Sequence, residues 1–209
     1  MNRNYQLELD NIIKNLDASC VPTLLIHSCC APCSSYVLEY LSDYFKITVY
    51  YYNPNIYPAD EFLFRMQEQK RFIEEFTANN PDKNPIDLIE SDHLSERFYE
   101  AVRGLENEPE GGKRCEKCFR LRLGESAKLA AEKGFDYFTT TLSISPHKNA
   151  QLLNELGEEI GSKAGVKYLY SDFKKRGGFV RSAEISKEYN MYRQDYCGCV
   201  YSYNERKNS

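Results

Sequence analysis

Short apolar stretches alternate with longer helical stretches along this chain, and this alternation restricts its possible folds more than any other feature. The expected strands are residues 23–27, 45–52, 86–90, 137–142 and 167–171, which are rich in β-branched, aliphatic or aromatic residues. Strands separated by helices predict a parallel sheet with right-handed crossovers and helices on both faces. We therefore expect an α/β fold with a doubly wound, mostly parallel sheet, Rossmann-like and nucleotide-hydrolase-like.

Apolar residues that recur at helical spacing mark the stretches between the strands. The expected helices are residues 5–16, 34–42, 60–78, 94–102, 114–133, 150–164 and 183–189. A chain of 209 residues predicts one domain. We expect a single α/β domain over residues 1–209, in which residues 1–20 form an N-terminal helical extension.

Neither a membrane anchor nor a secretory signal is expected from the sequence. The longest apolar runs, residues 23–26 and 47–52, are much shorter than a membrane-spanning helix. The first residues contain no apolar segment of the kind found in signal peptides. We therefore expect a cytoplasmic protein with no membrane partner. The net charge of −4 gives no general attraction to nucleic acid, so such binding would need a local basic patch.

Seven of the eight cysteines fall into three groups, and Cys20, which we expect to be inert, stands apart. The groups are Cys29, Cys30 and Cys33; Cys115 and Cys118; and Cys197 and Cys199. In a cytoplasmic protein, grouped cysteines indicate a metal or redox site rather than a structural disulfide framework.

The first cysteine group directly follows the first expected strand and leads into a helix. Ligands of open α/β sheets bind at the carboxyl ends of the strands, where the strand order reverses. A nucleotide-binding protein would carry a glycine-rich phosphate loop here, whereas this chain has Cys29, Cys30 and Cys33. A helix N-terminus also favours the thiolate form that binds metal. We expect a metallocluster at this edge of the sheet.

The second and third groups have different spacings. Cys115 and Cys118 have a chelating spacing and, with two thiolates of the first group, supply enough sulfur for either a four-iron cluster or tetrahedral zinc. The surplus of thiols favours redox chemistry. A disulfide between Cys197 and Cys199 would close a small strained ring, which is typical of catalytic disulfides. We interpret this pair as a dithiol that cycles.

Five motifs together resemble those of the QueH-type epoxyqueuosine reductases. They are Cys29-Cys-Ala-Pro-Cys33, Asn53-Pro-Asn-Ile-Tyr-Pro58 with Glu61, Arg114-Cys-Glu-Lys-Cys118, Ser143-Ile-Ser-Pro-His-Lys148 and Cys197-Gly-Cys199. The resemblance covers about residues 24–199. It implies a two-electron reductive deoxygenation of epoxyqueuosine to queuosine in tRNA, the last step of queuosine biosynthesis, with electrons from a donor that the sequence does not identify.

The resemblance also implies cofactors and the residues that hold them. A [4Fe-4S] cluster would be held by Cys29, Cys30, Cys115 and Cys118, and Cys197 and Cys199 would form a redox-active disulfide. An additional mononuclear metal ion, with iron the expected element, would lie close to the cluster. Cys33 is its natural ligand, because it lies beside the cluster ligands without being one of them. His27 and Glu61 are weaker candidates.

Recognition of tRNA needs positive charge near the site. The sequence offers a basic segment that contains Lys174, Lys175, Arg176 and Arg181, which we expect to contact tRNA phosphates. A second basic stretch lies beside the second cysteine pair and is the alternative docking place. It consists of Arg114, Arg120 and Arg122.

Three other functions are compatible with parts of this pattern. An ATP-dependent tRNA-thiolation or adenylylating enzyme could use a similar sheet, but the chain lacks a phosphate loop. A zinc-stabilised, non-enzymatic binding module would need only four of the cysteines. An electron-transfer protein without its own substrate would have no use for the basic segment or for the loop at residues 143–149.

Overall fold

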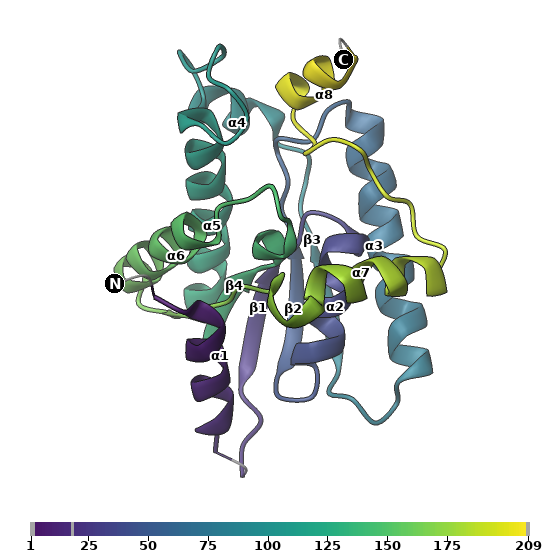
Figure 1. The fold of residues 1–209 in the computed structure, drawn as a ribbon. Coiled ribbons are helices and arrows are strands. Elements are labelled where there is room, and N and C mark those ends of the chain that lie inside the picture. The colour runs from purple at the N-terminus through teal and green to yellow at the C-terminus, as the bar shows by residue number, and fades with distance from the viewer. Residues whose placement is uncertain (1–2, 18, 208–209) are drawn as a thin grey trace.

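The computed structural model describes residues 3–17 and 19–207 and contains one five-stranded sheet (Figure 1). Its strands are β1 (Thr23–His27), β2 (Lys46–Tyr51), β3 (Ile86–Glu90), β4 (Tyr137–Thr140) and β5 (Lys167–Tyr168). All neighbouring strands are parallel, in the order β3-β2-β1-β4-β5. This arrangement confirms the predicted parallel α/β fold.

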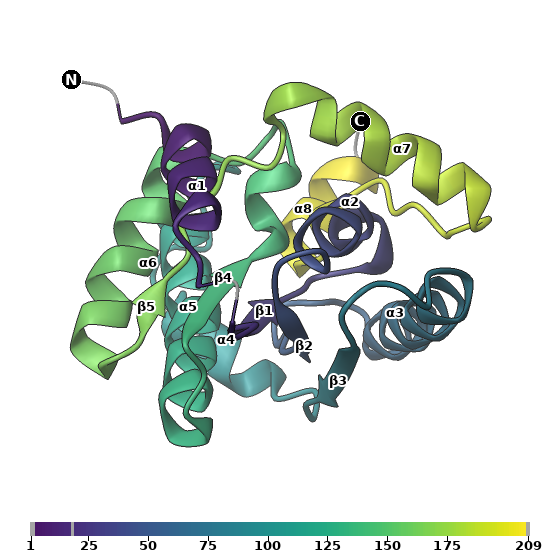
Figure 2. The same ribbon diagram turned by 90° about the horizontal axis from the view of Figure 1, so that it is seen from below.

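Helices cover both faces of the sheet (Figures 1 and 2). They are α1 (Tyr5–Lys14), α2 (Ala31–Leu41), α3 (Ala59–Asn79), α4 (Ser95–Ala101), α5 (Lys113–Lys133), α6 (Ala150–Ala164), α7 (Gly178–Glu188) and α8 (Val200–Lys207), with short 3₁₀ turns η1 (Thr141–Ile144) and η2 (Lys175–Gly177). Helices α2, α3 and α7 lie on one side, and α5 and α6 lie on the other. No helix among the described residues has both the length and the apolar character needed to cross a bilayer.

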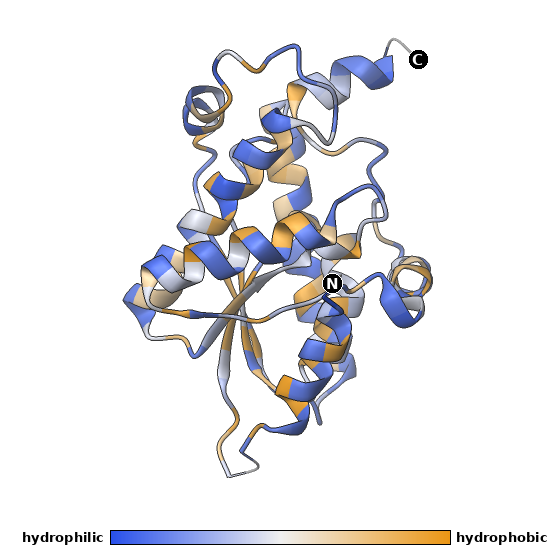
Figure 3. Cartoon of the chain, turned by 60° about the vertical axis from the view of Figure 1, so that its left-hand side comes forward, coloured by the Kyte–Doolittle hydropathy of each residue, from blue (hydrophilic) through white to orange (hydrophobic). Residues whose placement is uncertain are grey.

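The protein has a hydrophobic core on each face of the sheet. Strand β1 contributes to both cores because its side chains alternate between the two faces. Leu24 and Ile26 pack with α2, α3 and α7, while Leu25 packs with α5 and α6. All three side chains are fully buried. Figure 3 shows the same pattern, with hydrophobic residues along the strands and on the inward faces of the helices. The sequence stretch 23–27 is almost continuously apolar because the central strand is covered on both faces.

The predicted boundaries are wrong at the starts of two helices. Helix α2 begins at Ala31 rather than at residue 34, since Pro32 suits the first helical turn, where its missing N–H costs nothing. Helix α7 begins at Gly178 rather than at residue 183. Gly178 is not a helix breaker here. A Cβ at this position would overlap the carbonyl oxygen of Phe173 and would lie 2.5 Å from Cε1 of Tyr36, so the glycine permits close packing.

Two predicted strands are shorter than expected, and one helix was not predicted. Strand β4 ends at Thr140 and is followed by the 3₁₀ turn η1, while β5 contains only Lys167 and Tyr168. Helix α8 lacks an apolar stripe that would reveal it in the sequence, and Figure 3 shows its largely hydrophilic surface near the C-terminus.

Helix α1, within the predicted N-terminal extension, packs on the main body of the protein. Leu9 is fully buried in the core on the α2 side, and Ile12 and Ile13 pack against the same core. Residues 1, 2 and 18 of the predicted extension lie outside the described residues. The described part of the extension therefore adds apolar surface to the core.

Candidate functional site

The candidate site lies where the order of the strands reverses. From β1 the chain proceeds outward through β2 to β3, and it then returns to place β4 on the other side of β1. The carboxyl ends of β1 and β4 therefore form the switch point at which parallel α/β sheets bind ligands. The first cysteine group follows β1, and the Ser143–Lys148 loop follows β4.

The first cysteine group forms a compact set of sulfur atoms. The Sγ atoms of Cys29, Cys30 and Cys33 all lie within 4.8 Å of one another, and those of Cys29 and Cys30 are 3.7 Å apart. Cys30 is the N-cap of α2, and Cys33 lies in its first turn. The N-terminal end of the helix dipole therefore points at the sulfur atoms and favours negative charge there.

The three thiols of this group do not share one protonation state. Hydrogen bonds from Cys30 and Cys33 hold the pKa of Cys29 well below its usual range. Burial raises the pKa of Cys30, and the hydrogen bonds to Cys29 and Cys30 raise that of Cys33. The hydrogen bonds within the group thus favour the thiolate form at Cys29 and the thiol form at Cys30 and Cys33. Binding of a metal to all three sulfur atoms would release the remaining protons.

The second cysteine pair lies near the start of α5. Because α5 leads into β4, it runs opposite to the strands and begins at their carboxyl edge. Cys115 packs against the same apolar cluster as Cys29 and Cys30, and its Sγ accepts a hydrogen bond from the Gly111 N–H at 3.2 Å. Burial raises the pKa of Cys118 to about 11. The fold therefore brings the second pair to the edge that carries the first group.

The third pair is divided between a cavity wall and the protein interior. Both of its cysteines are free thiols. Cys197 lines a cavity, whereas Cys199 is buried beside Cys118. Burial raises the pKa of Cys199 to about 12, and its Sγ accepts a hydrogen bond from the Ser202 N–H at 3.5 Å. The two thiols of this pair therefore differ in accessibility.

His27 is fully buried, and both of its ring nitrogens have partners. Nε2 lies 3.1 Å from the carbonyl oxygen of Tyr52, and Nδ1 lies 2.9 Å from Oγ1 of Thr140. Since a carbonyl can only accept, Nε2 carries the proton and Nδ1 accepts from the threonine hydroxyl. Burial, aided by the charge of Arg122, lowers the pKa of His27 to about 3. This neutral histidine has no free lone pair for a metal ion.

Glu61, the other weaker metal candidate, is also occupied. Its Oε1 accepts from Nε of Arg65 at 2.7 Å and from the hydroxyl of Tyr192 at 3.1 Å. Glu61 is therefore the partner of a buried arginine. Among the predicted metal ligands beyond the cluster set, Cys33 alone lies within 4.8 Å of other thiols.

A cavity of about 630 Å³ opens beside the cysteines. Cys29, Cys33 and Cys197 lie in its wall. Such a volume accommodates a nucleoside-sized group. The cavity therefore gives a ligand of that size access to the first and third cysteine groups.

Two residues in the cavity wall had no role in the sequence-based prediction. Lys148 is half-buried, and although burial opposes its charge, the thiols of Cys197 and Cys29 raise its pKa above the ordinary value. Nε2 of Gln194 lies 2.8 Å from Sγ of Cys30. Lys148 belongs to the motif Ser143–Lys148, which was already singled out in the sequence. No feature of the sequence pointed to Gln194.

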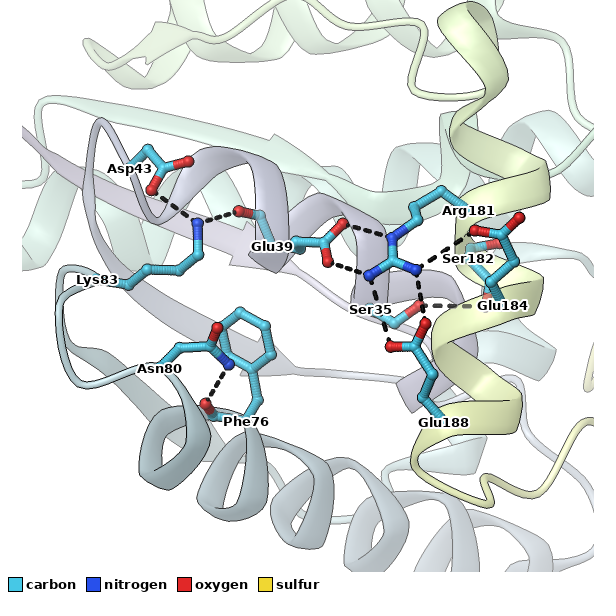
Figure 4. A network of polar contacts seen from close by, with 10 residues as sticks. All are labelled: Ser35, Glu39, Asp43, Phe76, Asn80, Lys83, Arg181, Ser182, Glu184 and Glu188. Carbon is cyan, nitrogen blue, oxygen red and sulfur yellow. Dashed lines mark hydrogen bonds and ion pairs between the residues drawn. The ribbon is translucent and has the colours of Figure 1, made fainter.

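The predicted tRNA-contacting arginine Arg181 has a structural role (Figure 4). Its Nη2 lies 2.6 Å from Glu39 of α2, and its Nη1 lies 2.7 Å from Glu188 and 3.3 Å from Glu184. This network ties α7 to α2. The guanidinium group is thus engaged with three carboxylates of the protein itself.

The other three residues of the basic segment lie near the surface. Lys174 pairs with Asp172 at 2.8 Å, and Arg176 pairs with Asp10 of α1. Lys175 is exposed and takes part in none of the ion pairs found among residues 3–17 and 19–207. These three positions are accessible to a ligand.

The structure does not support the alternative prediction that tRNA docks on the arginines beside the second cysteine pair. Arg114 and Arg122 are only 2% and 1% exposed, and Arg120 pairs with Glu116 and Glu159. This burial could not be predicted from the sequence because arginine is normally exposed. Two of these arginines face the protein interior and cannot reach phosphates.

The thiols and buried cations fit a thiolate-ligated metallocluster. Arg122 interacts electrostatically with Cys118, Cys197, Cys29 and Cys115, which places all three cysteine groups around one cation. Thiolates are the ligands that iron–sulfur clusters require, and their negative charge is costly to bury without counter-charges. The chemistry of these donors therefore suits a cluster.

Comparisons with known proteins agree with this geometry. The model of the protein family described as Epoxyqueuosine reductase QueH matches residues 24–205. The proteins named Epoxyqueuosine reductase QueH from Streptococcus pyogenes and Staphylococcus epidermidis are 45% and 43% identical over 207 residues. The alignments cover 97% and 96% of this chain, and 80% and 86% of those relatives.

A solved structure shares the fold at much lower sequence similarity. It is the U34-tRNA thiolase NcsA from Methanococcus maripaludis with its [4Fe-4S] cluster, which superposes with a TM-score of 0.50 at 14% identity. The match covers 93% of this chain and 66% of the thiolase chain. At this identity the likeness concerns the fold alone.

Proposed function

The chain belongs to the family of QueH epoxyqueuosine reductases, and we propose that it performs the reduction with a [4Fe-4S] cluster and a redox-active cysteine pair. The reaction removes the epoxide oxygen of epoxyqueuosine and consumes two electrons and two protons, with the oxygen leaving as water. The proposed cluster ligands are Cys29, Cys30, Cys115 and Cys118. We place the enzyme in the cytoplasm, with an electron donor that is still to be identified.

One observation carries this proposal: three cysteine groups from distant parts of the chain meet at the switch point, beside a cavity of about 630 Å³. A structural zinc site needs four ligands and no adjoining cavity. When bound, the cluster supplies single electrons, and a neighbouring metal ion would add a second redox centre and Lewis acidity. Cys33 remains the proposed ligand of that ion because its Sγ is beside the cluster ligands.

The asymmetry of Cys197 and Cys199 supports separate roles within the redox pair. Cys197, in the cavity wall, is the thiol that external reductants and substrate can approach. Cys199, buried and with a raised pKa, is suited to remain protonated until it closes the disulfide. Closure of the disulfide would deliver two electrons and two protons, which is the amount that one turnover consumes.

Metal and sulfide analysis of the anaerobically purified protein tests the proposal. We expect about four iron atoms and four labile sulfides per chain, and one further metal ion if the mononuclear site is filled. The protein should be brown and should absorb broadly in the visible range. Stoichiometric zinc without labile sulfide would refute the cluster.

Lys148 is placed to provide a proton or to stabilise the oxygen that leaves. Its ammonium group lies in the cavity wall close to Cys29 and Cys197, and the thiols keep it protonated at neutral pH by raising its pKa. We expect Lys148→Met to lower kcat by about 10²–10⁴, the usual contribution of a general acid. Iron content should stay at the wild-type level.

The matched control for Lys148 is its neighbour His147, which also lines the cavity but is exposed. His147→Ala should change kcat little. Equal losses in the two variants, or wild-type activity of Lys148→Met, would exclude this role for the lysine.

We further propose that tRNA phosphates bind the accessible part of the basic segment. Changing Lys174, Lys175 and Arg176 together to alanine should weaken tRNA binding. Each lost phosphate contact should reduce the slope of log affinity against log salt by about 0.7–0.9. Titrations at several salt concentrations measure both effects, and cluster content should not change.

Arg181→Ala is the informative comparison for that triple variant, because its guanidinium already binds three carboxylates. This variant should lower thermal stability while leaving the salt slope unchanged. Wild-type affinity and slope in the triple variant would show that tRNA docks elsewhere.

A further inference from the structure

Two buried arginines approach the cysteine site from opposite sides, and neither has a role in the chemistry described above. Arg65 on α3 and Arg122 on α5 are each only 1% exposed. Burying a guanidinium group is costly unless its charge and its N–H groups find partners. Each arginine therefore calls for a physical explanation.

Arg65 has one carboxylate partner, and its guanidinium carbon lies 5.0 Å from the centroid of the Tyr196 ring. Its Nε donates to Glu61 at 2.7 Å, but Nη1 and Nη2 are buried without a hydrogen-bond partner. A Cβ atom at Gly198 would lie 3.2 Å from Nη1, so the guanidinium group borders the Cys197-Gly198-Cys199 turn. It also interacts electrostatically with Cys30. Its spare donors thus lie between a proposed cluster ligand and the redox pair.

Arg122 is even less compensated. No ion pair within the described ranges of the chain includes it, its Nε donates to the carbonyl oxygen of Cys118 at 3.3 Å, and its buried Nη2 has no partner. Cys115, Cys118 and Arg122 recur on one face of α5 at spacings of three and four residues. The helix therefore turns this cation toward the same space as the two thiols.

We propose that Arg65 and Arg122 are positioning residues that set the reduction potential of the cluster, as fixed positive charges and as N–H donors toward its sulfur atoms. The inference rests on the proposed cluster. Reduction adds one electron, supplied by the external donor, to a site that already carries thiolate charge. Positive charge and hydrogen bonds to sulfur stabilise the reduced state more than the oxidised state and raise the potential.

The proposal can be tested with substitutions that should shift the reduction potential of the cluster in opposite directions. Arg65→Gln and Arg122→Gln each remove a positive charge and should make the cluster harder to reduce. Glu61→Gln keeps the shape of the residue that pairs with Arg65 but removes the negative charge, so it should make the cluster easier to reduce. We expect each change to shift the one-electron reduction equilibrium at least tenfold, which corresponds to about 59 mV.

Midpoint potentials should be measured by anaerobic redox titration of the full-length, cluster-loaded protein, followed by electron paramagnetic resonance. Arg120→Gln is the matched control, because Arg120 lies on α5 but pairs with Glu116 and Glu159 at the surface. This control should titrate like the wild type. Melting temperatures of all variants report any purely structural role, which would lower stability without moving the potential.

Each outcome is decisive. Lower midpoints for both arginine variants, with a higher midpoint for Glu61→Gln, would support the assignment. Unchanged midpoints in variants that retain the cluster would overturn it. If the arginine variants lose the cluster, Glu61→Gln still decides, since an unchanged potential in that variant contradicts the proposal. A wild-type protein without iron and sulfide would refute the cluster itself and is distinguishable from these results.

Discussion

Replacing Cys118 with serine should remove most of the cluster from the protein and reduce epoxyqueuosine reduction to background. Loss of an outer-shell partner alone lowers metal affinity by about 10–100-fold, so loss of a proposed ligand should cost at least that much. Cys118 is buried at the start of α5, and a serine hydroxyl there is a much poorer ligand for iron. Iron and sulfide content, together with visible absorbance, measure the effect.

The lone Cys20 provides the matched control for that substitution. It is exposed and separate in sequence from the three groups, so Cys20→Ser should retain wild-type iron and activity. A Cys118→Ser protein with full iron content would mean that another thiol completes the cluster. Cys33 and Cys197 would then be the candidates, because both lie in the cavity wall.

Replacing Cys197 with serine should abolish multiple turnover and leave the cluster in place. The reason is that Cys197 belongs to the redox pair in our proposal and not to the cluster ligands. When it is reduced beforehand, the variant can use only the electrons stored in its metal centres. It should convert at most the corresponding amount of substrate, and the reaction should then stop. Rapid-quench measurements under single- and multiple-turnover conditions separate these phases.

Cys199→Ser should give the same kinetic result, although its thiol is buried and that of Cys197 lines the cavity. Both thiols are needed for a disulfide, whatever their exposure. Bleaching of the cluster by Cys197→Ser would contradict our division of the seven cysteines between cluster and redox pair.

The sequence predicted the parts of the fold that depend on local pattern. The alternation of strands and helices identified the parallel sheet, and the cysteines after β1 correctly pointed to its carboxyl edge. Errors arose where tertiary packing decides the outcome. Helix α7 begins at Gly178 and not at the predicted residue 183, and Phe173 and Tyr36 leave no space for a side chain at this glycine.

The cysteine groups were visible in the sequence, but the charges around them were not. Arg122 was assigned to a surface because arginine usually lies there, and only the structure shows it buried. Likewise, Arg181 pairs with Glu39 of α2, which is far from it in sequence, so composition could not reveal that this arginine ties two helices together. Gln194 approaches Cys30 across 164 positions, a contact that no local motif encodes.

The position of the segment between α7 and α8 along the chain bears on how the protein is assembled during translation. All four proposed cluster ligands are synthesised by residue 118, whereas Gln194 and the Cys197-Gly198-Cys199 turn follow much later in the chain. The turn then docks on the loop before α3, where the Tyr57 N–H donates to the Gly198 carbonyl oxygen at 2.7 Å. Because chains emerge from the N-terminus first, the thiols that we propose as cluster ligands exist before the segment that contacts Cys30 through Gln194. The order of the motifs along the chain thus makes the proposed ligands available before the segment that carries Gln194 and the proposed redox pair.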